Sequence, residues 1–270
     1  MSTERPRPQP PLPALLLGVS TKMYFTYSQT NTYLADLCNT FYSPTTSTAE
    51  TPTLFVIPSF PSLGLAAANL RSTPHILLGA QDCHWEDYGP WTGEVSPAEL
   101  ADVGCSLVEL GHAERRRAPF NETNEIVAAK AAAAVRNGLV PLVCIGEVAR
   151  SKVASEGVGL AVREVIPQVK AVLESVPGRA GVVFAYEPVW AIGAEEPAGV
   201  EHVRTVVGEI KRAVNDMEGR TGEVRVIYGG SAGPGTWKGL SGMLDGLFLG
   251  RFAHDLSNVE RVVKEMEEAG

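Results

Sequence analysis

The sequence predicts an α/β protein with a single-domain (β/α)8 barrel, on two observations. Short apolar runs rich in leucine and β-branched residues recur along the 270 residues with little polar alternation. Such runs are typical of parallel strands buried on both faces. Segments with helical spacing lie between them, and eight strands alternating with helices in a chain of this length favour a closed barrel with outer helices. An open doubly wound sheet is the alternative.

The eight expected strands recur from residue 14 to residue 250, each followed by polar or turn-forming residues. They are ALLLGVS (14–20), TLFVIPS (53–59), HILLGA (75–80), SLVELG (106–111), LVPLVCIG (139–146), GVVFAYE (181–187), VRVIYGG (224–230) and DGLFLG (245–250).

The clearest helices have recognisable ends. Ser96-Pro97 is typical of a helix start, with serine as N-cap and proline in the first turn. Residues 124–136 are rich in alanine and charge and stop at Asn137-Gly138, a typical helix end. Residues 153–176 and 198–217 are predicted to form longer helices.

Two segments lie outside this alternation. Residues 1–13 are rich in proline and are expected to form a flexible tail, which leaves 14–270 as the barrel domain. Residues 43–53 are polar and rich in turn formers, so we expect a loop insertion before the second strand. The start of the chain has no signal-peptide pattern, and the cytoplasm is therefore the expected location.

The composition of the chain excludes some classes of binding partner. The net charge of −8 disfavours nucleic acid, and no apolar stretch has the length of a membrane span. The cysteines show no CxxC pair and no metal-ligand spacing, which predicts free thiols in a reducing compartment. The cysteines are Cys38, Cys83, Cys105 and Cys144.

Ionisable and glycine-rich groups follow several of the expected strands. In a (β/α)8 barrel, the active site forms at the carboxyl ends of the strands. Lys22 and His112 follow the first and fourth strands, Glu187 ends the sixth, YGGS (228–231) ends the seventh, and Gly250-Arg251 ends the eighth. Taken singly, each has a plain structural interpretation: a solvated lysine, a capping histidine, a paired glutamate or an ordinary turn. The glycines fit no GxGxxG spacing.

The order of these groups resembles the triosephosphate isomerase family over residues 15–263. The resemblance implies a TIM barrel that interconverts dihydroxyacetone phosphate and glyceraldehyde 3-phosphate through an enediolate, in glycolysis and gluconeogenesis. It implies no metal and no organic cofactor. The stretches that carry it are LGHAERRR, CIGE, AYEPVWAIG, YGGS and AQDCHWEDYGPWTGEVSP.

The resemblance also implies roles for individual residues. Glu187 matches the base that moves a proton between two carbons, and His112 matches the neutral imidazole that polarises the carbonyl. Lys22 matches the lysine that offsets the charge of the phosphate and the enediolate, and Glu114 matches its acidic partner. The phosphate-binding positions of the family fall on Gly193, Ser231 and Gly250.

By the same resemblance the protein is expected to be a homodimer that binds a small phosphorylated sugar. The loop after the third strand, residues 82–93, would enter the neighbouring subunit. Trp85, Tyr88, Pro90 and Trp91 give this loop an apolar tip, which an interface explains better than solvent does. A loop folded onto its own barrel is the alternative.

Several departures from the family cluster at the substrate. Ser20 stands where the family has asparagine, which retracts a donor and suggests a roomier, altered substrate contact. Arg251 stands where the family has a second glycine, and it either adds a charge-assisted bond to phosphate or points to solvent. The lid continues as Ala194-Glu195-Glu196-Pro197 and looks shortened, with a proline that narrows its hinge. Thr21, Tyr24 and Ala113 also differ from the family.

Three functions are therefore considered. The main prediction is a triosephosphate isomerase, because Lys22, His112 and Glu187 are all present. The second is an isomerase of a four-carbon sugar phosphate, because Ser20 and the Gly250-Arg251 pair are similar to an erythrulose-phosphate isomerase branch of the family. The third is a paralogue that binds a phosphorylated ligand without turnover, which the altered lid allows.

Overall fold

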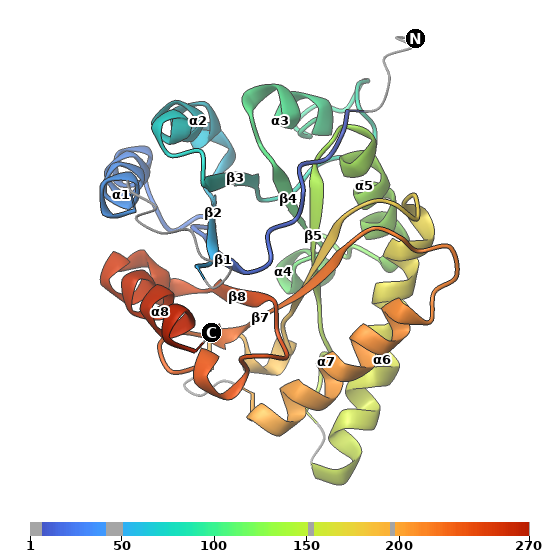
Figure 1. The fold of residues 1–270 in the computed structure, drawn as a ribbon. Coiled ribbons are helices and arrows are strands. Elements are labelled where there is room, and N and C mark those ends of the chain that lie inside the picture. The colour runs from blue at the N-terminus through green and yellow to red at the C-terminus, as the bar shows by residue number, and fades with distance from the viewer. Residues whose placement is uncertain (1–6, 42–50, 151–153, 195–197, 270) are drawn as a thin grey trace.

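The computed structural model describes residues 7–41, 51–150, 154–194 and 198–269, and it confirms the predicted (β/α)8 barrel. Within these residues, eight parallel strands close in chain order, with β8 pairing back to β1 (Figure 1). The strands are β1 Leu16–Ser20, β2 Thr53–Ile57, β3 Ile76–Ala80, β4 Leu107–Leu110, β5 Val140–Ile145, β6 Val182–Tyr186, β7 Val224–Ala232 and β8 Gly246–Leu249.

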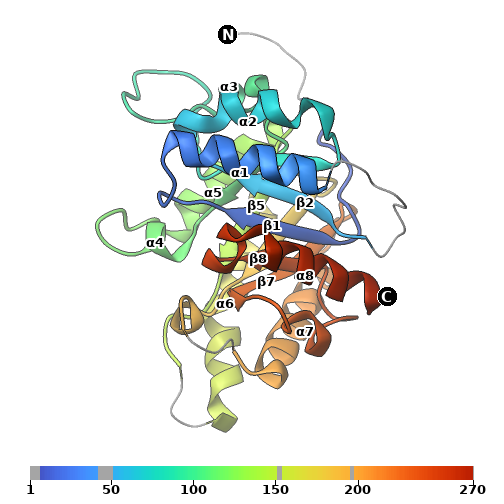
Figure 2. The ribbon, with the colours of Figure 1, turned by 90° about the vertical axis from the view of Figure 1, so that its left-hand side faces the viewer.

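Helices surround the strands in both views (Figures 1 and 2). The described helices are α1 Tyr27–Thr40, α2 Leu63–Asn69, α3 Pro97–Val103, α4 Ala113–Arg116, α5 Asn124–Arg136, α6 Ala154–Ser175, α7 Val200–Asn215 and α8 Leu256–Glu268. Short 3-10 helices add η1 Phe60–Ser62, η2 Leu70–Ser72, η3 Val189–Ala191, η4 Trp237–Gly239 and η5 Arg251–His254.

Local sequence explains where the clearest helices begin. Ser96 accepts hydrogen bonds from the backbone of Ala98 and Glu99 and so caps α3, as the Ser-Pro pair predicts. Thr26 caps α1 and forms a reciprocal capping box with Gln29. Helix α5 has the bounds that the sequence predicts.

Two apolar layers hold the fold together. The larger packs the outward faces of the strands against the helices, and the smaller fills the barrel interior. The interior is tight at its base: a Cβ on Gly18 would lie 1.8 Å from the ring of Phe55, the residue opposite it in the β1–β2 register. A glycine is therefore required on β1 so that one aromatic ring can fill the base.

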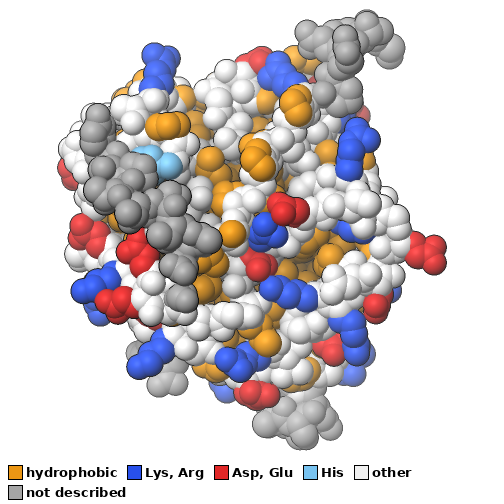
Figure 3. All heavy atoms as spheres, viewed as in Figure 1, with side chains coloured by type: hydrophobic (Ala, Val, Ile, Leu, Met, Phe, Trp, Pro, Cys, Tyr) orange, Lys and Arg blue, Asp and Glu red, His pale blue; other side chains and the backbone are white. Residues whose placement is uncertain are grey.

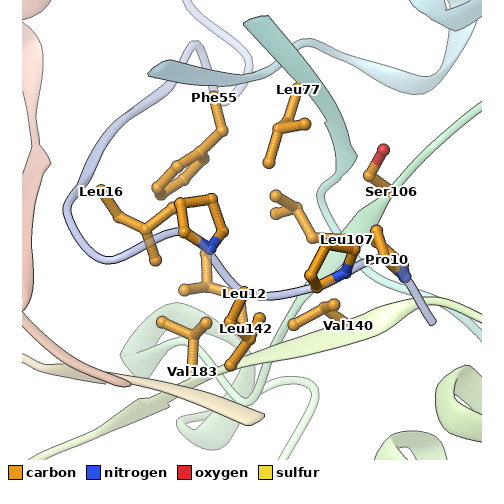
Figure 4. A pocket seen from close by; sticks show the side chains of 12 residues that line it. Pro10, Leu12, Leu16, Phe55, Leu77, Ser106, Leu107, Val140, Leu142 and Val183 are labelled. Atoms are coloured by element: carbon orange, nitrogen blue, oxygen red, sulfur yellow. The ribbon is translucent and has the colours of Figure 1, made fainter. Parts of the chain in front are cut away.

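The segment before β1 lies across the amino-terminal end of the barrel. Gln9 bonds the backbone of Gly181 in both directions, and Arg225 donates to the carbonyl of Pro13 at 2.8 Å. Leu12 packs against the interior cluster of side chains and lines one apolar pocket together with Phe55 (Figure 4). The predicted flexibility of the 1–13 tail stays a prediction, and residues 1–6 lie outside the described part of the chain, as do residues 43–50 of the expected insertion.

Charged side chains are interspersed by sign on the face seen in Figure 3, with apolar atoms toward its centre. No helix in the described ranges is long and apolar enough to cross a membrane.

Candidate active site

Lys22 lies just beyond β1 in a left-handed backbone conformation with φ of 46°. Gln81 fixes this turn by donating to the Lys22 carbonyl at 2.9 Å. The Lys22 Nζ donates to Glu114 Oε1 at 3.0 Å and lies 3.2 Å from His112 Nε2. Burial alone would lower the pKa of Lys22, but the Glu114 carboxylate, helped by Glu187, raises it above its ordinary value. The lysine is therefore a fixed positive charge in the site.

His112 follows β4 and is the N-cap of α4. The backbone N–H of Glu114 donates to His112 Nδ1 at 3.1 Å, so the ring proton resides on Nε2. Burial, followed by the charge of Lys22, lowers the pKa of His112 to about 4. At neutral pH the ring is an uncharged donor whose Nε2 points to the centre of the site.

Glu187 follows β6 and is anchored by its backbone N–H, which donates to the Ile145 carbonyl at 2.8 Å. Its Oε2 lies 3.5 Å from His112 Nε2 and makes no hydrogen bond to any described residue. Burial, followed by the charge of Glu109, raises the pKa of Glu187 to about 8. A carboxyl whose proton affinity lies near neutral pH is suited to general acid–base chemistry.

The predicted phosphate contacts lie together at the rim of the same end. Gly193 has φ of 71°, and Ser231 has φ of 57° and donates from Oγ to the Ala191 carbonyl at 2.7 Å. The exposed Arg251 opens η5 directly after Gly250, and its Nη2 would lie 3.8 Å from a Cβ built on Gly193. The arginine therefore leans toward the base of the lid. Residues 195–197 at the tip of the lid lie outside the described residues.

Ser20 ends β1 on the floor of the site and is 5% exposed. The Ser20 hydroxyl favours the ionised form of Glu109 and so opposes the rise in the pKa of that carboxyl, which burial causes. No described atom forms a hydrogen bond of good geometry with Ser20 Oγ. Ser20 Oγ is therefore a buried hydroxyl that can still form a hydrogen bond with a bound molecule.

The supports of the lid base were missed by sequence reasoning. The buried Glu147 accepts from Trp190 Nε1 and from Tyr186 OH, and it lies 2.9 Å from His202 Nε2. On the other side of the lid, Tyr228 OH accepts from the backbone N–H of Ala198 at 2.9 Å. Glu147 and Tyr228 stand inside the CIGE and YGGS motifs, which could have signalled them.

Glu109 was also missed. It lies on β4 and is 4% exposed. Its Oε1 accepts a hydrogen bond from Cys144 Sγ at 3.9 Å. The available signal was a single glutamate in the middle of the apolar run SLVELG. Its proximity to Glu187 could not be read from the sequence, because β4 and β6 are not neighbours in the sheet.

The loop over residues 82–93 is held at its base and exposed at its tip. Asp82 binds the buried Lys130 at 2.7 Å, and His84 stacks on Trp85 inside the loop. Tyr88 and Trp91 are 72% and 44% exposed. The homodimer remains a prediction.

The described residues contain no group of three or more His, Cys, Asp or Glu placed to hold a metal ion. The fold and these contacts define a (β/α)8-barrel protein whose lysine, neutral imidazole and buried carboxylate meet at the carboxyl ends of the strands.

The chain belongs to the triosephosphate isomerase family, because residues 15–266 match the family model of that description. Similar proteins are named L-erythrulose-1-phosphate isomerase. One from Pectobacterium atrosepticum is 42% identical over 93% of this chain and 95% of its own length. Others from Rhizobium etli and Mycolicibacterium smegmatis are 45% and 41% identical, over 74% and 78% of each chain respectively.

The prediction of triose phosphates as substrates is contradicted by these relatives, whose names state a four-carbon substrate. The predicted place in glycolysis and gluconeogenesis depended on it and has no support from them. Lys22, His112 and Glu187 could not discriminate, because the same proton transfer serves both substrates. The departures at Ser20 and Arg251 pointed to the four-carbon alternative.

Proposed function

We propose that the protein isomerises L-erythrulose 1-phosphate. This ketose carries its phosphate on C1, its carbonyl on C2 and hydroxyls on C3 and C4. Removal of the C3 proton gives an enediolate over C2 and C3, and return of the proton to C2 leaves the carbonyl on C3. The reaction thus interconverts two ketotetrose phosphates. The relatives' names and the meeting of His112 and Glu187 at 3.5 Å support it.

In this reaction Glu187 takes the proton from C3 and returns it to C2. The neutral His112 donates from Nε2 to the substrate oxygens, and it can do so without carrying a charge of its own. Lys22 offsets the negative charge that develops on the enediolate, and Glu114 holds the lysine in place at 3.0 Å.

The substitution at Ser20 supports a place for the extra carbon at the floor of the site. Compared with dihydroxyacetone phosphate, L-erythrulose 1-phosphate bears a hydroxymethyl group on the carbon that loses the proton. Ser20 is shorter than the asparagine of the family pattern, and its Oγ has no well-formed hydrogen bond in the described structure. We propose that this hydroxyl binds a substrate hydroxyl, because a buried polar group without a partner is costly.

The phosphate end would lie at the rim. The backbone N–H groups of Gly193, Ser231 and Gly250 are proposed donors, and Arg251 supplies a positive charge beside Gly193. A guanidinium binds a phosphate with two parallel hydrogen bonds, so it adds orientation as well as charge.

The decisive experiment compares kcat/KM on L-erythrulose 1-phosphate with kcat/KM on dihydroxyacetone phosphate. We expect the four-carbon substrate to win by more than about tenfold, or about 1.4 kcal/mol of transition-state preference. A preference for the triose would refute the proposal. Absence of turnover on both, with phosphate ligands still raising the melting temperature, would favour the non-catalytic paralogue.

Two substitutions test the assigned roles. Glu187→Asp retracts the base and should lower kcat far more than ligand affinity. Arg251→Gly should mainly raise KM, and Arg251→Lys should recover part of the loss because it restores the charge. Unchanged kinetics in Arg251→Gly would show that the arginine points to solvent.

We also propose that two copies pair through the loop over residues 82–93, whose exposed Tyr88 and Trp91 support an interface. Tyr88→Glu should shift the protein to monomers in light scattering, whereas Tyr27→Glu, a change at another exposed tyrosine on α1, should not.

A further inference from the structure

The short helix η5, which carries Arg251 at its first position, is contacted by aromatic rings from the segment after β1. The ring of Phe25 lies 4.6 Å from the ring of His254, centroid to centroid, and the ring of Tyr24 lies 5.3 Å from it. Both pairs are tilted, at 55° and 60° respectively, which is a favoured arrangement for aromatic rings at this separation. The last residue of η5 is therefore packed against two rings of another segment.

A further ring fixes the neighbouring residue of η5. Tyr33 on α1 is buried, and its hydroxyl donates to the Ala253 carbonyl at 2.7 Å. The same ring lies 5.4 Å from the ring of Phe25. We call Tyr24, Phe25, Tyr33 and His254 the ring cluster. It joins the segment after β1 to η5 at two successive residues of the short helix.

The imidazole of His254 takes part in the ring cluster through packing. Its Nε2 is buried and has no hydrogen-bond partner among the described residues. Burial, followed by the charge of Arg251, lowers the pKa of His254, so the ring is uncharged at neutral pH. A neutral ring whose contacts are packing contacts can be replaced by phenylalanine, whereas alanine would remove them.

Arg251 and His254 stand three positions apart in one 3-10 helix, where side chains with this spacing lie one above the other. The backbone N–H of Ala253 donates to the Gly250 carbonyl at 3.0 Å and closes the turn between them. At the other end of the helix, Arg251 Nη2 would lie 3.8 Å from a Cβ built on Gly193. A contact that fixes His254 thus also fixes the backbone from which Arg251 extends toward the base of the lid.

We propose that His254 is a positioning residue that holds η5, and with it Arg251, in the place where the guanidinium meets the substrate phosphate. Tyr24 and Phe25 supply the surface on which the imidazole packs. Because both lie within three residues of Lys22, the ring cluster also fixes the phosphate end relative to the lysine at the centre of the site. The binding of phosphate at Arg251 rests on the proposed function; the holding of η5 by the ring cluster does not.

The first test is a double-mutant cycle of His254→Ala with Arg251→Gly, followed as KM for L-erythrulose 1-phosphate. His254→Ala should raise KM by about fivefold and leave kcat within about twofold of the natural value, because the groups at the centre of the site are untouched. His254→Phe should restore KM, since it keeps a packed ring. In the Arg251→Gly background, His254→Ala should have no further effect on KM.

Tyr27→Ala is the matched control, because it removes an exposed tyrosine of α1 that lies outside the ring cluster. It should leave KM and kcat unchanged. An equal rise of KM from His254→Ala with and without Arg251 would overturn the proposal, and so would a failure of His254→Phe to restore KM. If His254→Ala does not fold, Tyr24→Ala, which removes a ring that is 55% exposed, takes its place in the cycle.

Inorganic phosphate separates this proposal from the proposed function. Its dissociation constant is measured by titration calorimetry on the natural protein, the two single variants and the double variant. We expect His254→Ala to weaken phosphate binding only where Arg251 is present. If the natural protein does not turn over L-erythrulose 1-phosphate, the proposed function fails, and these titrations still decide the role of His254. A natural protein that binds no phosphate, or a His254→Ala variant that binds it equally well, would overturn the proposal.

Discussion

Gly229 on β7 offers the sharpest perturbation of the proposed base. A Cβ at this position would lie 2.3 Å from Glu187 Oε1 and 2.8 Å from Glu187 Cγ, where ordinary contacts begin at 3.4 Å. Gly229 has no positive φ, so alanine fits its backbone and the clash falls on the Glu187 side chain. We predict that Gly229→Ala pushes this carboxylate aside by about 1 Å, since closer contacts are strongly repulsive.

A displacement of this size should lower kcat by about 100-fold, or about 2.7 kcal/mol. KM should change little, because the proposed phosphate contacts around Gly193 and Arg251 are untouched. The assay is steady-state isomerisation of L-erythrulose 1-phosphate, with circular dichroism and a melting curve to verify folding.

Gly208→Ala is the matched control. Nothing lies within 4 Å of a Cβ at Gly208, which is on α7 and away from the site. Alanine there should leave kcat unchanged and raise stability by about 1 kcal/mol or less, as expected for a helix interior. A folded Gly229→Ala whose kcat stays within about threefold of the natural value would refute the placement of Glu187 as the reacting base.

Three further predictions concern stability. Lys130→Met removes the cation that Asp82 and Glu122 bind at 2.7 and 2.6 Å. It should lower the free energy of unfolding in urea by about 3–5 kcal/mol. A loss below about 1 kcal/mol would contradict a structural role for this cluster. Leu12→Ala should cost about 2 kcal/mol, because the side chain is partly buried at the barrel base; no change in melting temperature would contradict that packing. Glu187 binds its proton more tightly in the folded state than in the unfolded chain, so the native protein should lose stability as pH rises from about 5 to 8. Glu187→Gln cannot ionise and should gain stability relative to it over that range; parallel pH curves would contradict the raised pKa.

Much of the fold could be predicted, because strands that are buried on both faces appear in the sequence as continuous apolar runs. The run LVPLVCIG produces β5 with every residue buried, and the Asn137-Gly138 stop ends α5 at the expected place. The site was predicted as a set of residues at strand ends. The inward contacts between them were not, because they depend on which side chains share a layer of the barrel interior.

Glu109 shows why. In the sequence it is a lone polar residue in a strand, which would equally suit an edge strand or a solvent-facing position. The pairing of β4 with β5 places it beside Cys144, at a depth where its charge acts on Glu187. The triose-phosphate prediction was wrong for a different reason: the motifs report the chemistry of proton transfer, whereas the preference for one sugar depends on the shape and charge around it.

The two positive charges of the site lie at different places, in a way that is compatible with the proposed four-carbon substrate. Lys22 forms an ion pair with Glu114, and the carboxyls of Glu114, Glu187 and Glu109 all favour its charged form. Its positive charge therefore acts at the centre of the site. Arg251 stands at the rim beside Gly193 and makes no ion pair within the described residues. A phosphate bound at the rim would thus be neutralised by its own cation. Lys22 is then left to stabilise the enediolate, even when an added hydroxymethyl group separates the reacting carbon from the pocket floor at Ser20.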